Sequence, residues 1–505
     1  MMSGIVAAHG PFDPALGDRM LSRLAHRGPH GVGSTQVGDA WLGSRYLSIT
    51  DPRHGGQPIA SGSAHMVGDG EIYNHNRIRA RLADVHYDSD SDFEAALALF
   101  DAIGPAAFDQ LWGTYALVMA ADDGRFAVGR DVLGIAPLYW ARRGDTTLFA
   151  SEMKAFDADW RPLVAPFPPG HVWTPDDGLV DSGAEPAEVP VLLQSRAPEE
   201  EPPAWVFDAV RETLVRAVER RLDAEPEVGV LLSGGVDSSI VTAIAARRAR
   251  ENGTRLKTFA VGMEGSADLA AARAMSEFAG TDHYEEIYTA DDAIALVPDV
   301  IASLESFDPT LVHSAVPNHL VSQLASRHVS IVLVGEGADE LFAGYSHYGR
   351  YESGVALHEE LLATIAGMHI GGLQRVDRVA AANGMETRLP FLDLDVVELA
   401  LALPPGWKLT TPEREAKWLL RRAFDGWVPG EVLWRPKEQF GQGTGMNDVL
   451  RRHFGATVSD DELARDAREL EPPIRTREEL AYYRLFTESL PGVNAQTTVG
   501  RFVEA

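Results

Sequence analysis

The sequence predicts an α/β protein with two parts, a sheet-rich N-terminal domain and a C-terminal domain built on a doubly wound parallel sheet. The N-terminal prediction rests on short segments of alternating apolar and polar residues between turns, at 65–67, 116–119, 125–128 and 147–150. The C-terminal prediction rests on apolar strand patterns that alternate with helical patterns, which is typical of a parallel sheet with helices on both faces. These strands are expected near 228–233, 256–262 and 330–335, and the helices near 238–252, 268–279 and 313–327.

A stretch rich in proline and glutamate separates the two parts. Between Gly183 and Pro203 five prolines are interspersed with glutamates, a composition that is typical of an exposed linker. From about residue 340 onward the pattern is mostly helical. We therefore expect an N-terminal domain at residues 1–185, a linker at 186–204 and a C-terminal domain at 205–505.

The composition argues against several classes of protein. The chain has 505 residues and a formal net charge of −29, which argues against a dedicated nucleic-acid or anionic-membrane surface. It contains no cysteine, which excludes disulfides, thiolate metal sites and a cysteine nucleophile. Because the sequence has neither a signal-peptide pattern nor an apolar run of about 20 residues, we expect a cytoplasmic protein that does not span a membrane.

The segment 228–239, Val-Gly-Val-Leu-Leu-Ser-Gly-Gly-Val-Asp-Ser-Ser, passes from an apolar strand through a turn into a helix. The glycines would let the backbone approach an anion, and the hydroxyls and backbone amides would donate to phosphate oxygens at the helix N-terminus. A carboxylate beside a phosphate is repelled unless a cation lies between them, so we interpret Asp237 as a Mg²⁺ ligand. The alternative is an ordinary turn in which Asp237 caps the helix. The candidate phosphate-binding residues are Ser233, Gly234, Gly235, Asp237 and Ser238.

A second turn, Val334-Gly335-Glu336-Gly337-Ala338-Asp339-Glu340-Leu341, also follows an apolar run and precedes a helical pattern. Two such turns at the carboxyl ends of neighbouring parallel strands would face one crevice. Asp339 could then share the metal with Asp237, and Glu336 could take a proton from an incoming amine. The alternative is that Asp339 and Glu340 only favour the dipole of a first helical turn.

A third segment, 434–443, places Lys437 in a loop, because Pro436 and the glycines that follow prevent a continuous helix. A loop lysine on such an enzyme suggests stabilisation of transition-state charge. Taken alone, a lysine of this kind is usually solvated surface.

Together these segments resemble glutamine-dependent asparagine synthetases, and the resemblance extends over essentially the whole chain. The turn at 233–238 is similar to the pyrophosphate loop of ATP pyrophosphatases and lacks the lysine of a Walker P-loop. In the N-terminal part the matching motifs are Gly70-Glu71-Ile72-Tyr73-Asn74, Arg130-Asp131, Gly134–Tyr139, Ser151-Glu152-Met153-Lys154 and Phe167–His171. In the C-terminal part they are Arg375–Arg378, Glu386–Asp393 and Lys437–Phe440.

The resemblance implies an Ntn-hydrolase-like αββα glutaminase-type domain followed by an ATP pyrophosphatase domain with a helical C-terminal part. It also implies that ATP adenylates a side-chain carboxylate, and that nitrogen then attacks to give an amide, AMP and pyrophosphate. By position, Glu336 would support intermediate formation and proton loss from the amine, and Lys437 would stabilise charge during amide formation. Adenosine would contact Leu231, Val261, Val334 and Gly335, pyrophosphate would contact Ser233–Ser238, and Mg²⁺ would bind Asp237 and Asp339.

The chain departs from the family where the family hydrolyses glutamine. The family exposes an N-terminal cysteine nucleophile, whereas this chain has Ser3 at that position. A hydroxyl has a far higher pKa than a thiol and needs stronger activation. Ser3 would become an N-terminal nucleophile only if translation began at Met2 and processing removed that methionine.

Two further changes affect the same site. Tyr46 replaces the arginine that would bind the glutamine carboxylate, and the adjacent Arg45 would point elsewhere on a strand. Asp69 replaces an asparagine and places a negative charge beside a developing oxyanion, whereas Asp92, which matches the aspartate for the glutamine amine, is retained. We therefore expect the domain to keep its fold and to lack glutaminase activity. The residues of this degenerate site are Ser3, Tyr46, Asp69, Gly70, Glu71 and Asp92.

The acceptor site is also altered. Thr310 matches the family, but His313 stands where the family has an arginine for aspartate or the leaving pyrophosphate. A fixed-charge bidentate donor has thus become a titrating imidazole. Either a nearby basic residue compensates for this change, or aspartate is not the carboxylate substrate.

We favour an ATP-dependent ligase that uses ammonia or another amine on aspartate or a related amino acid, with ATP and Mg²⁺ as cofactors. A β-lactam-synthetase-like enzyme would close an internal amide, but those enzymes have a tyrosine at the position of Glu336. A glutamine-hydrolysing synthetase would need a replacement nucleophile, and a non-catalytic relative would not need a complete ATP site. We include a homodimer among the expected partners, and neither nucleic acid nor a membrane.

Overall fold

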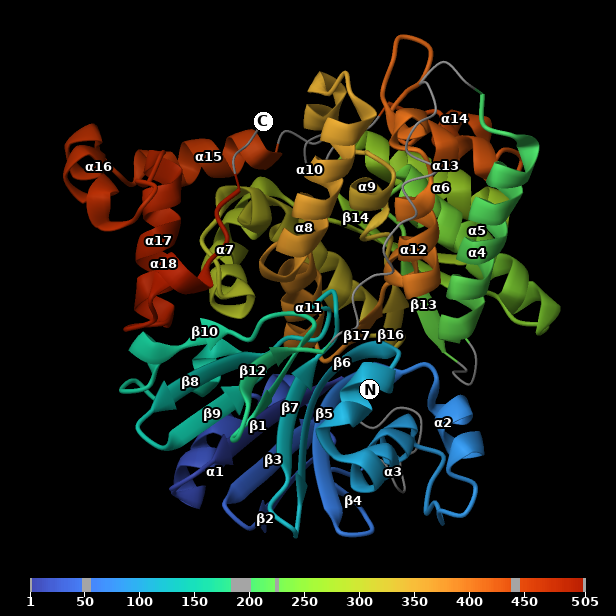
Figure 1. Cartoon of the computed structure of the whole chain (residues 1–505). Helices are drawn as coiled ribbons and strands as arrows, with labels where there is room; N and C mark the ends of the chain where they lie inside the picture. The colour runs from blue at the N-terminus through green and yellow to red at the C-terminus, as the bar shows by residue number, and fades with distance from the viewer. Residues whose placement is uncertain (1, 48–55, 183–200, 223–226, 437–445, 503–505) are drawn as a thin grey trace.

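The computed structural model describes residues 2–47, 56–182, 201–222, 227–436 and 446–502, so most of the expected linker at 186–204 lies outside the described residues. The N-terminal part (blue to teal) lies against the C-terminal part (green to red), as Figure 1 shows. Helix α11 (Gly372–Ala382) and strand β17 (Glu386–Arg388) of the C-terminal part lie at the junction. No helix among the described residues has the length and apolar character needed to cross a membrane.

Two antiparallel sheets stack face to face in the N-terminal part. Because side chains alternate along a strand, β1 (Ser3–His9) buries Ile5 against the second sheet and Val6 against helix α1 (Pro14–Ser22). Helix α3 (Asp92–Ile103) covers the outer face of the second sheet. The layers therefore follow the order α, β, β, α, which confirms the expected fold of this domain.

Each of the two sheets has six strands among the described residues. The first sheet has the spatial order β10 (Ala165–Pro166), β8 (Tyr139–Arg143), β9 (Thr146–Ala150), β1, β3 (Ala40–Tyr46), β2 (Gly31–Val37). The second has the order β12 (Gly178–Asp181), β11 (His171–Thr174), β7 (Phe126–Arg130), β6 (Gly113–Ala121), β5 (Ala64–Ile72), β4 (Ile59–Ser61), and helix α2 (His75–Arg81) follows β5. The four strand segments expected from the sequence coincide with β5, β6, β7 and β9.

The C-terminal part contains a five-stranded parallel sheet. Its spatial order is β15 (Asp282–Ile287), β14 (Lys257–Gly262), β13 (Val228–Leu231), β16 (Ile331–Leu333), β17. The chain starts at β13, builds outward through β14 and β15, and then returns to add β16 and β17 on the other side. The switch point between β13 and β16 is where an open parallel sheet binds its ligand.

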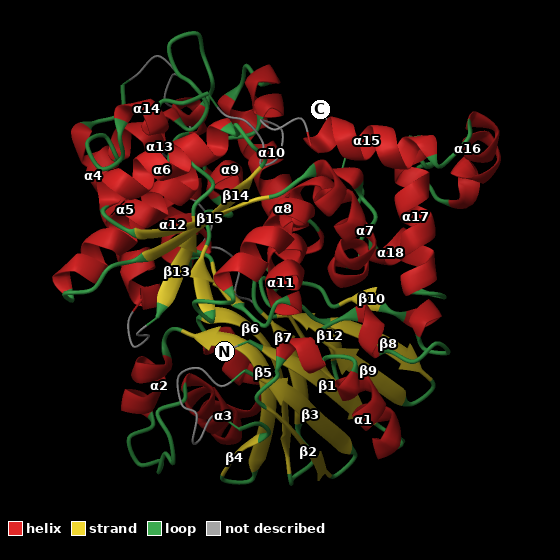
Figure 2. Ribbon diagram, turned by 180° about the vertical axis from the view of Figure 1, so that it is seen from behind, coloured by secondary structure: helices red, strands yellow, loops and turns green. Residues whose placement is uncertain are grey.

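Helices cover both faces of this sheet, as expected. Helices α5 (Val236–Glu251) and α6 (Ala267–Ala279) pack together on one face, and α8 (Pro309–Ala325) crosses the other face (Figure 2). Helix α4 (Ala204–Leu222) packs on α5, and α7 (Ala290–Leu304) packs on α8 and α11. The remaining helices are α9 (Ala338–Leu341), α10 (Gly354–Gly367), α12 (Leu394–Ala402), α13 (Trp418–Ala423), α14 (Gly430–Leu433), α15 (Met446–Ala456), α16 (Asp460–Asp466), α17 (Arg477–Ser489) and α18 (Ala495–Thr498).

Lys408, a buried lysine distant in sequence from the predicted turns, gives a pH-dependent prediction. Its ammonium donates to the carbonyl oxygen of Ala400, and burial lowers its pKa to about 7. Between pH 7 and the ordinary lysine pKa the unfolded chain binds the extra proton, so the free energy of unfolding rises with pH across this window. We expect Lys408→Met to raise the Tm at pH 6 and to lose this advantage near pH 10. Thermal melts across that range test it, and a pH-independent difference would contradict it.

Candidate active site

The first predicted phosphate turn lies between β13 and the N-terminus of α5, at the switch point of the sheet. Gly234 has a φ of 74°, and a Cβ there would lie 2.6 Å from the carbonyl oxygen of Asp268, so a side chain does not fit. The hydroxyls of Ser233 and Ser238 lie 3.1 Å apart, and the amide of Gly235 donates to Ser233 Oγ at 3.4 Å. The turn is therefore preformed at the amino end of a long helix, where backbone N–H groups favour an anion.

The second predicted turn lies directly beside the first. It connects β16 to α9, and a Cβ on Gly335 would lie only 2.8 Å from the Cβ of Asp237. The expected adenosine contacts Leu231, Val261 and Val334 stand at or just beyond the carboxyl ends of the neighbouring strands β13, β14 and β16. The structure thus brings both turns and these apolar side chains to one edge of the sheet.

Asp237 and Asp339 converge on one cationic group, the ammonium of Lys417. Lys417 Nζ lies 2.6 Å from Asp237 Oδ2 and 2.8 Å from Asp339 Oδ1, and its side chain is 1% exposed. Burial alone would lower the pKa of Lys417, but the two carboxylates raise it above its ordinary value. Sequence analysis missed Lys417.

This geometry also suits a divalent cation, because two carboxylate oxygens already point at one position. Among the described residues no group of three or more His, Cys, Asp or Glu side chains could hold a metal ion. A Mg²⁺ ion held by Asp237 and Asp339 would therefore need phosphate oxygens or water to complete its coordination.

Glu336 forms an ion pair across the crevice with Arg375 on α11, at 2.5 Å between Oε1 and Nη2. The neighbouring Glu340 is buried and accepts a hydrogen bond of 2.6 Å from the hydroxyl of Tyr345. Burial, together with the charges of Asp339 and Glu336, raises the pKa of Glu340 to about 7. The ion pair with Arg375 fixes the carboxylate of Glu336, which the sequence analysis predicts to be a proton acceptor. The other nominated catalytic residue, Lys437, lies outside the described residues.

The two expected acceptor residues lie on α8. Thr310 stands in its first turn and is half-buried. His313 is buried, and its Nε2 lies 2.7 Å from Oε1 of Glu478 on α17, which also accepts a hydrogen bond from the hydroxyl of Tyr482. The imidazole is thus held by an acidic partner, and this contact supplies no basic residue in place of the family's arginine.

At the expected glutaminase site, the carboxylate of Asp69 binds the backbone of Ser3. The amide N–H of Ser3 donates to Asp69 Oδ1 at 2.7 Å, and Gln57 Nε2 lies 3.3 Å from the Ser3 hydroxyl. Burial raises the pKa of Asp69 to about 6, although Arg27 opposes the rise. An ionised aspartate offers only acceptors, whereas an oxyanion needs donors.

The other residues of this site surround the end of β1. Tyr46 pairs with Ser3 in the β1–β3 ladder, and Arg45 donates toward the carbonyl oxygen of Leu21 in α1. Asp92 accepts the amide N–H of Ile72 at 2.5 Å, and burial raises the pKa of Asp92. Gly70 has a φ of 118° on β5, beside Glu71.

A buried ion network joins this site to the C-terminal part. Arg27 donates to Asp69 and Glu152 of its own domain at 2.8 and 3.0 Å, and to both oxygens of Asp377 on α11 at 2.7 and 2.9 Å. Asp377 in turn accepts from Arg378 at 2.7 Å. The two domains therefore share one buried cluster of charged side chains.

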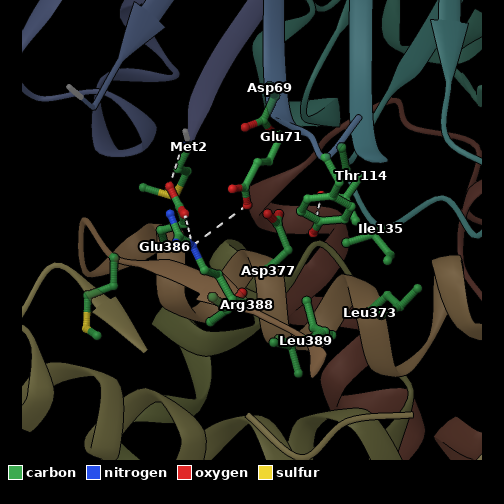
Figure 3. A pocket seen from close by; sticks show the side chains of 16 residues that line it. Met2, Asp69, Glu71, Thr114, Ile135, Leu373, Asp377, Glu386, Arg388 and Leu389 are labelled. Carbon is green, nitrogen blue, oxygen red and sulfur yellow. Dashed lines mark hydrogen bonds and ion pairs between the residues drawn. The ribbon is translucent and has the colours of Figure 1, made fainter. Parts of the chain in front are cut away.

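A cavity of about 60 Å³ lies next to this network, between the two domains (Figure 3). Arg388 points into it from β17, toward Glu386 and Glu71, and the amide of Met2 donates to Glu386 at 3.0 Å. The space is large enough for ordered water, which could hydrogen-bond to the charged side chains that line it.

Comparison with known proteins covers nearly the whole chain. A family model described as asparagine synthase matches residues 209–355 and 349–495, and one described as a glutamine amidotransferase domain matches residues 2–164. The chain is 34% identical over 526 residues to glutamine-hydrolyzing asparagine synthetase 2 of Arabidopsis thaliana, covering 99% of this chain and 89% of the relative. It is 35% identical over 541 residues to a probable glutamine-hydrolyzing asparagine synthetase of Schizosaccharomyces pombe, covering 99% and 95%.

Proposed function

Because the chain belongs to the asparagine synthetase family, we propose that it converts a side-chain carboxylate of aspartate or a related amino acid into an amide, using ATP and free ammonia or another amine. The observation that carries this proposal is the convergence of Asp237 and Asp339 beside the preformed turn 233–238. A phosphate cradle and a cation position at one strand switch point suit the cleavage of ATP between its α- and β-phosphates.

In the first step, an oxygen of the substrate carboxylate attacks the α-phosphorus of ATP. The bond from that phosphorus to the bridging oxygen breaks, and pyrophosphate leaves with both electrons of the bond. Backbone N–H groups of the turn and the hydroxyls of Ser233 and Ser238 would hold the leaving pyrophosphate. Mg²⁺, when bound by Asp237 and Asp339, would supply charge neutralisation for the phosphates.

In the second step, the amine nitrogen attacks the acyl carbon of the adenylate, and AMP leaves as the amide forms. The nitrogen must lose a proton, and we assign the role of proton acceptor to Glu336, whose carboxylate is held by Arg375. Lys437 would stabilise the negative charge that develops during this step.

The nitrogen source that we propose is ammonia or another amine rather than glutamine. If Ser3 carried a free α-amino group, Asp69 would lie 2.7 Å from its nitrogen and would favour the protonated form. Such an ammonium could not accept the hydroxyl proton, as an N-terminal nucleophile requires. The carboxylate of Asp69 would in addition repel the oxyanion.

The acceptor that we propose is aspartate or a close relative. His313 lies 2.7 Å from Glu478, so its environment differs from that of an arginine free to bind a carboxylate or pyrophosphate. This change bears on how the acceptor carboxylate or the leaving pyrophosphate is bound.

The test is to incubate the protein with ATP, Mg²⁺ and aspartate, adding ammonia to one sample and glutamine to another, and to quantify AMP, asparagine and glutamate. We expect AMP and asparagine with ammonia, and neither asparagine nor glutamate above background with glutamine. Ser3→Ala should leave the ammonia reaction unchanged. Glutamate formation that Ser3→Ala abolishes would overturn the assignment of a degenerate domain. Absence of AMP in both samples would overturn aspartate as the acceptor.

A further inference from the structure

The position between Asp237 and Asp339 is filled by a side chain of the protein itself. We propose that Lys417 is the resident cation of the nucleotide site, which keeps free divalent metal away from these carboxylates and moves to the phosphates when metal arrives with ATP. This inference rests on the proposed function, because it requires ATP and Mg²⁺ to bind at this site.

The contacts of Lys417 hold its ammonium in a defined position between the two carboxylates. Its ammonium lies 2.6 and 2.8 Å from the two carboxylates, and its backbone has a φ of 60°, which is uncommon for a residue other than glycine. Gly344 makes room for the side chain, because a Cβ at that position would lie 2.0 Å from both Lys417 Cε and Asp339 Oδ1. Local backbone conformation and packing therefore both place the ammonium there.

An ammonium ion and a divalent metal cannot share this position. Either cation must lie within contact distance of the same two oxygens, and their mutual repulsion is weakly screened because the lysine is almost fully buried. A free metal ion must therefore displace the Lys417 ammonium from both carboxylates.

ATP changes this balance, because its polyphosphate brings the missing negative charge. Asp237 belongs to the turn 233–238, so phosphate bound at this turn would lie close to the Lys417 ammonium. Lysine is suited to such a transfer, since its charge sits on a flexible four-carbon stem. The nearby Arg421 is less free to respond, because its guanidinium donates to the carbonyl oxygens of Ala416 and Arg435 at 2.9 and 3.1 Å.

The direct test is a calorimetric titration of the full-length protein with Mn²⁺ alone, in place of Mg²⁺, for the wild type and Lys417→Met. We expect the variant to bind one Mn²⁺ per chain at least about tenfold more tightly than the wild type. Asp237→Asn in the Lys417→Met background should remove this binding. Lys257→Met, which alters a lysine on β14 that faces Glu227, is the matched control and should behave as the wild type.

A second measurement needs no variant and protects the test against misfolding of Lys417→Met. For the wild type we expect a rise in Tm with ATP and Mg²⁺ together, and no rise with Mg²⁺ alone. Tight Mn²⁺ binding by the wild type without nucleotide would overturn the proposal, as would a folded Lys417→Met protein with unchanged affinity. Neither experiment contains an amino-acid acceptor, so a failed amidation assay and a failed lysine–metal exchange are distinguishable.

Discussion

Asp237→Asn should lower the rate of ATP-dependent AMP formation by a factor on the order of 10² to 10³ while leaving the chain folded. The substitution keeps the size of the side chain but removes one of the two negative charges that face the cation position. Lys417 retains Asp339 as a partner, so no buried charge is stranded. The measurement is AMP release with aspartate and ammonia, alongside circular dichroism and a thermal melt.

The matched control for this variant is Asp291→Asn. Asp291 is an exposed aspartate in the first turn of α7, and its loss tests for any general effect of the same substitution. It should leave AMP release unchanged. Normal turnover by Asp237→Asn would exclude this carboxylate from the nucleotide site, whatever the behaviour of the control.

Much of the fold is predictable because its strands carry strong periodic patterns. β13, β14 and β16 are apolar and lie between helices, so their sequence reports burial on both faces. β17 has no such apolar pattern and could not be predicted in this way. Its Glu386 and Arg388 are charged and pair with each other at 2.8 Å within the domain junction. The edge strand β15 could not be predicted from an apolar run either, because most of its residues are polar.

The candidate site divides in the same way. The turns 233–238 and 334–341 are predictable, because a few consecutive residues after a strand contain the whole phosphate-binding motif. Lys417 has no such signal, as it lies 180 residues from Asp237 and only folding brings the two together. Arg375 likewise gains its significance from Glu336, on a different element.

The environment of Asp69 shows what the charge of a single residue cannot predict. The aspartate at position 69 indicates an unfavourable negative charge beside an oxyanion. The sequence does not reveal that Arg27 neutralises it, or that Asp377 from the other domain completes the cluster. Asp69, a residue of the expected glutaminase site, thus contributes through Arg27 to a cluster that joins the two domains.

We expect Arg27→Met to be the most destabilising of the substitutions considered, by roughly 3–5 kcal/mol. Arg27 is fully buried and donates to three carboxylates, those of Asp69, Glu152 and Asp377. Removing one partner from a buried ion network costs far more than the network itself contributes, because the remaining charges stay desolvated. For domains of this size the loss corresponds to a fall in Tm of more than about 5 °C.

Arg19→Met is the appropriate comparison, since Arg19 is about half exposed and forms its ion pair with Asp157 near the surface. An exposed ion pair contributes at most about 1 kcal/mol to the free energy of unfolding, so the Tm of Arg19→Met should differ little from that of the wild type. The Arg27 variant should also expose the domain junction to limited proteolysis, because Asp377 loses its contact across that junction. If the two variants melted alike, the buried cluster would not be holding the domains together.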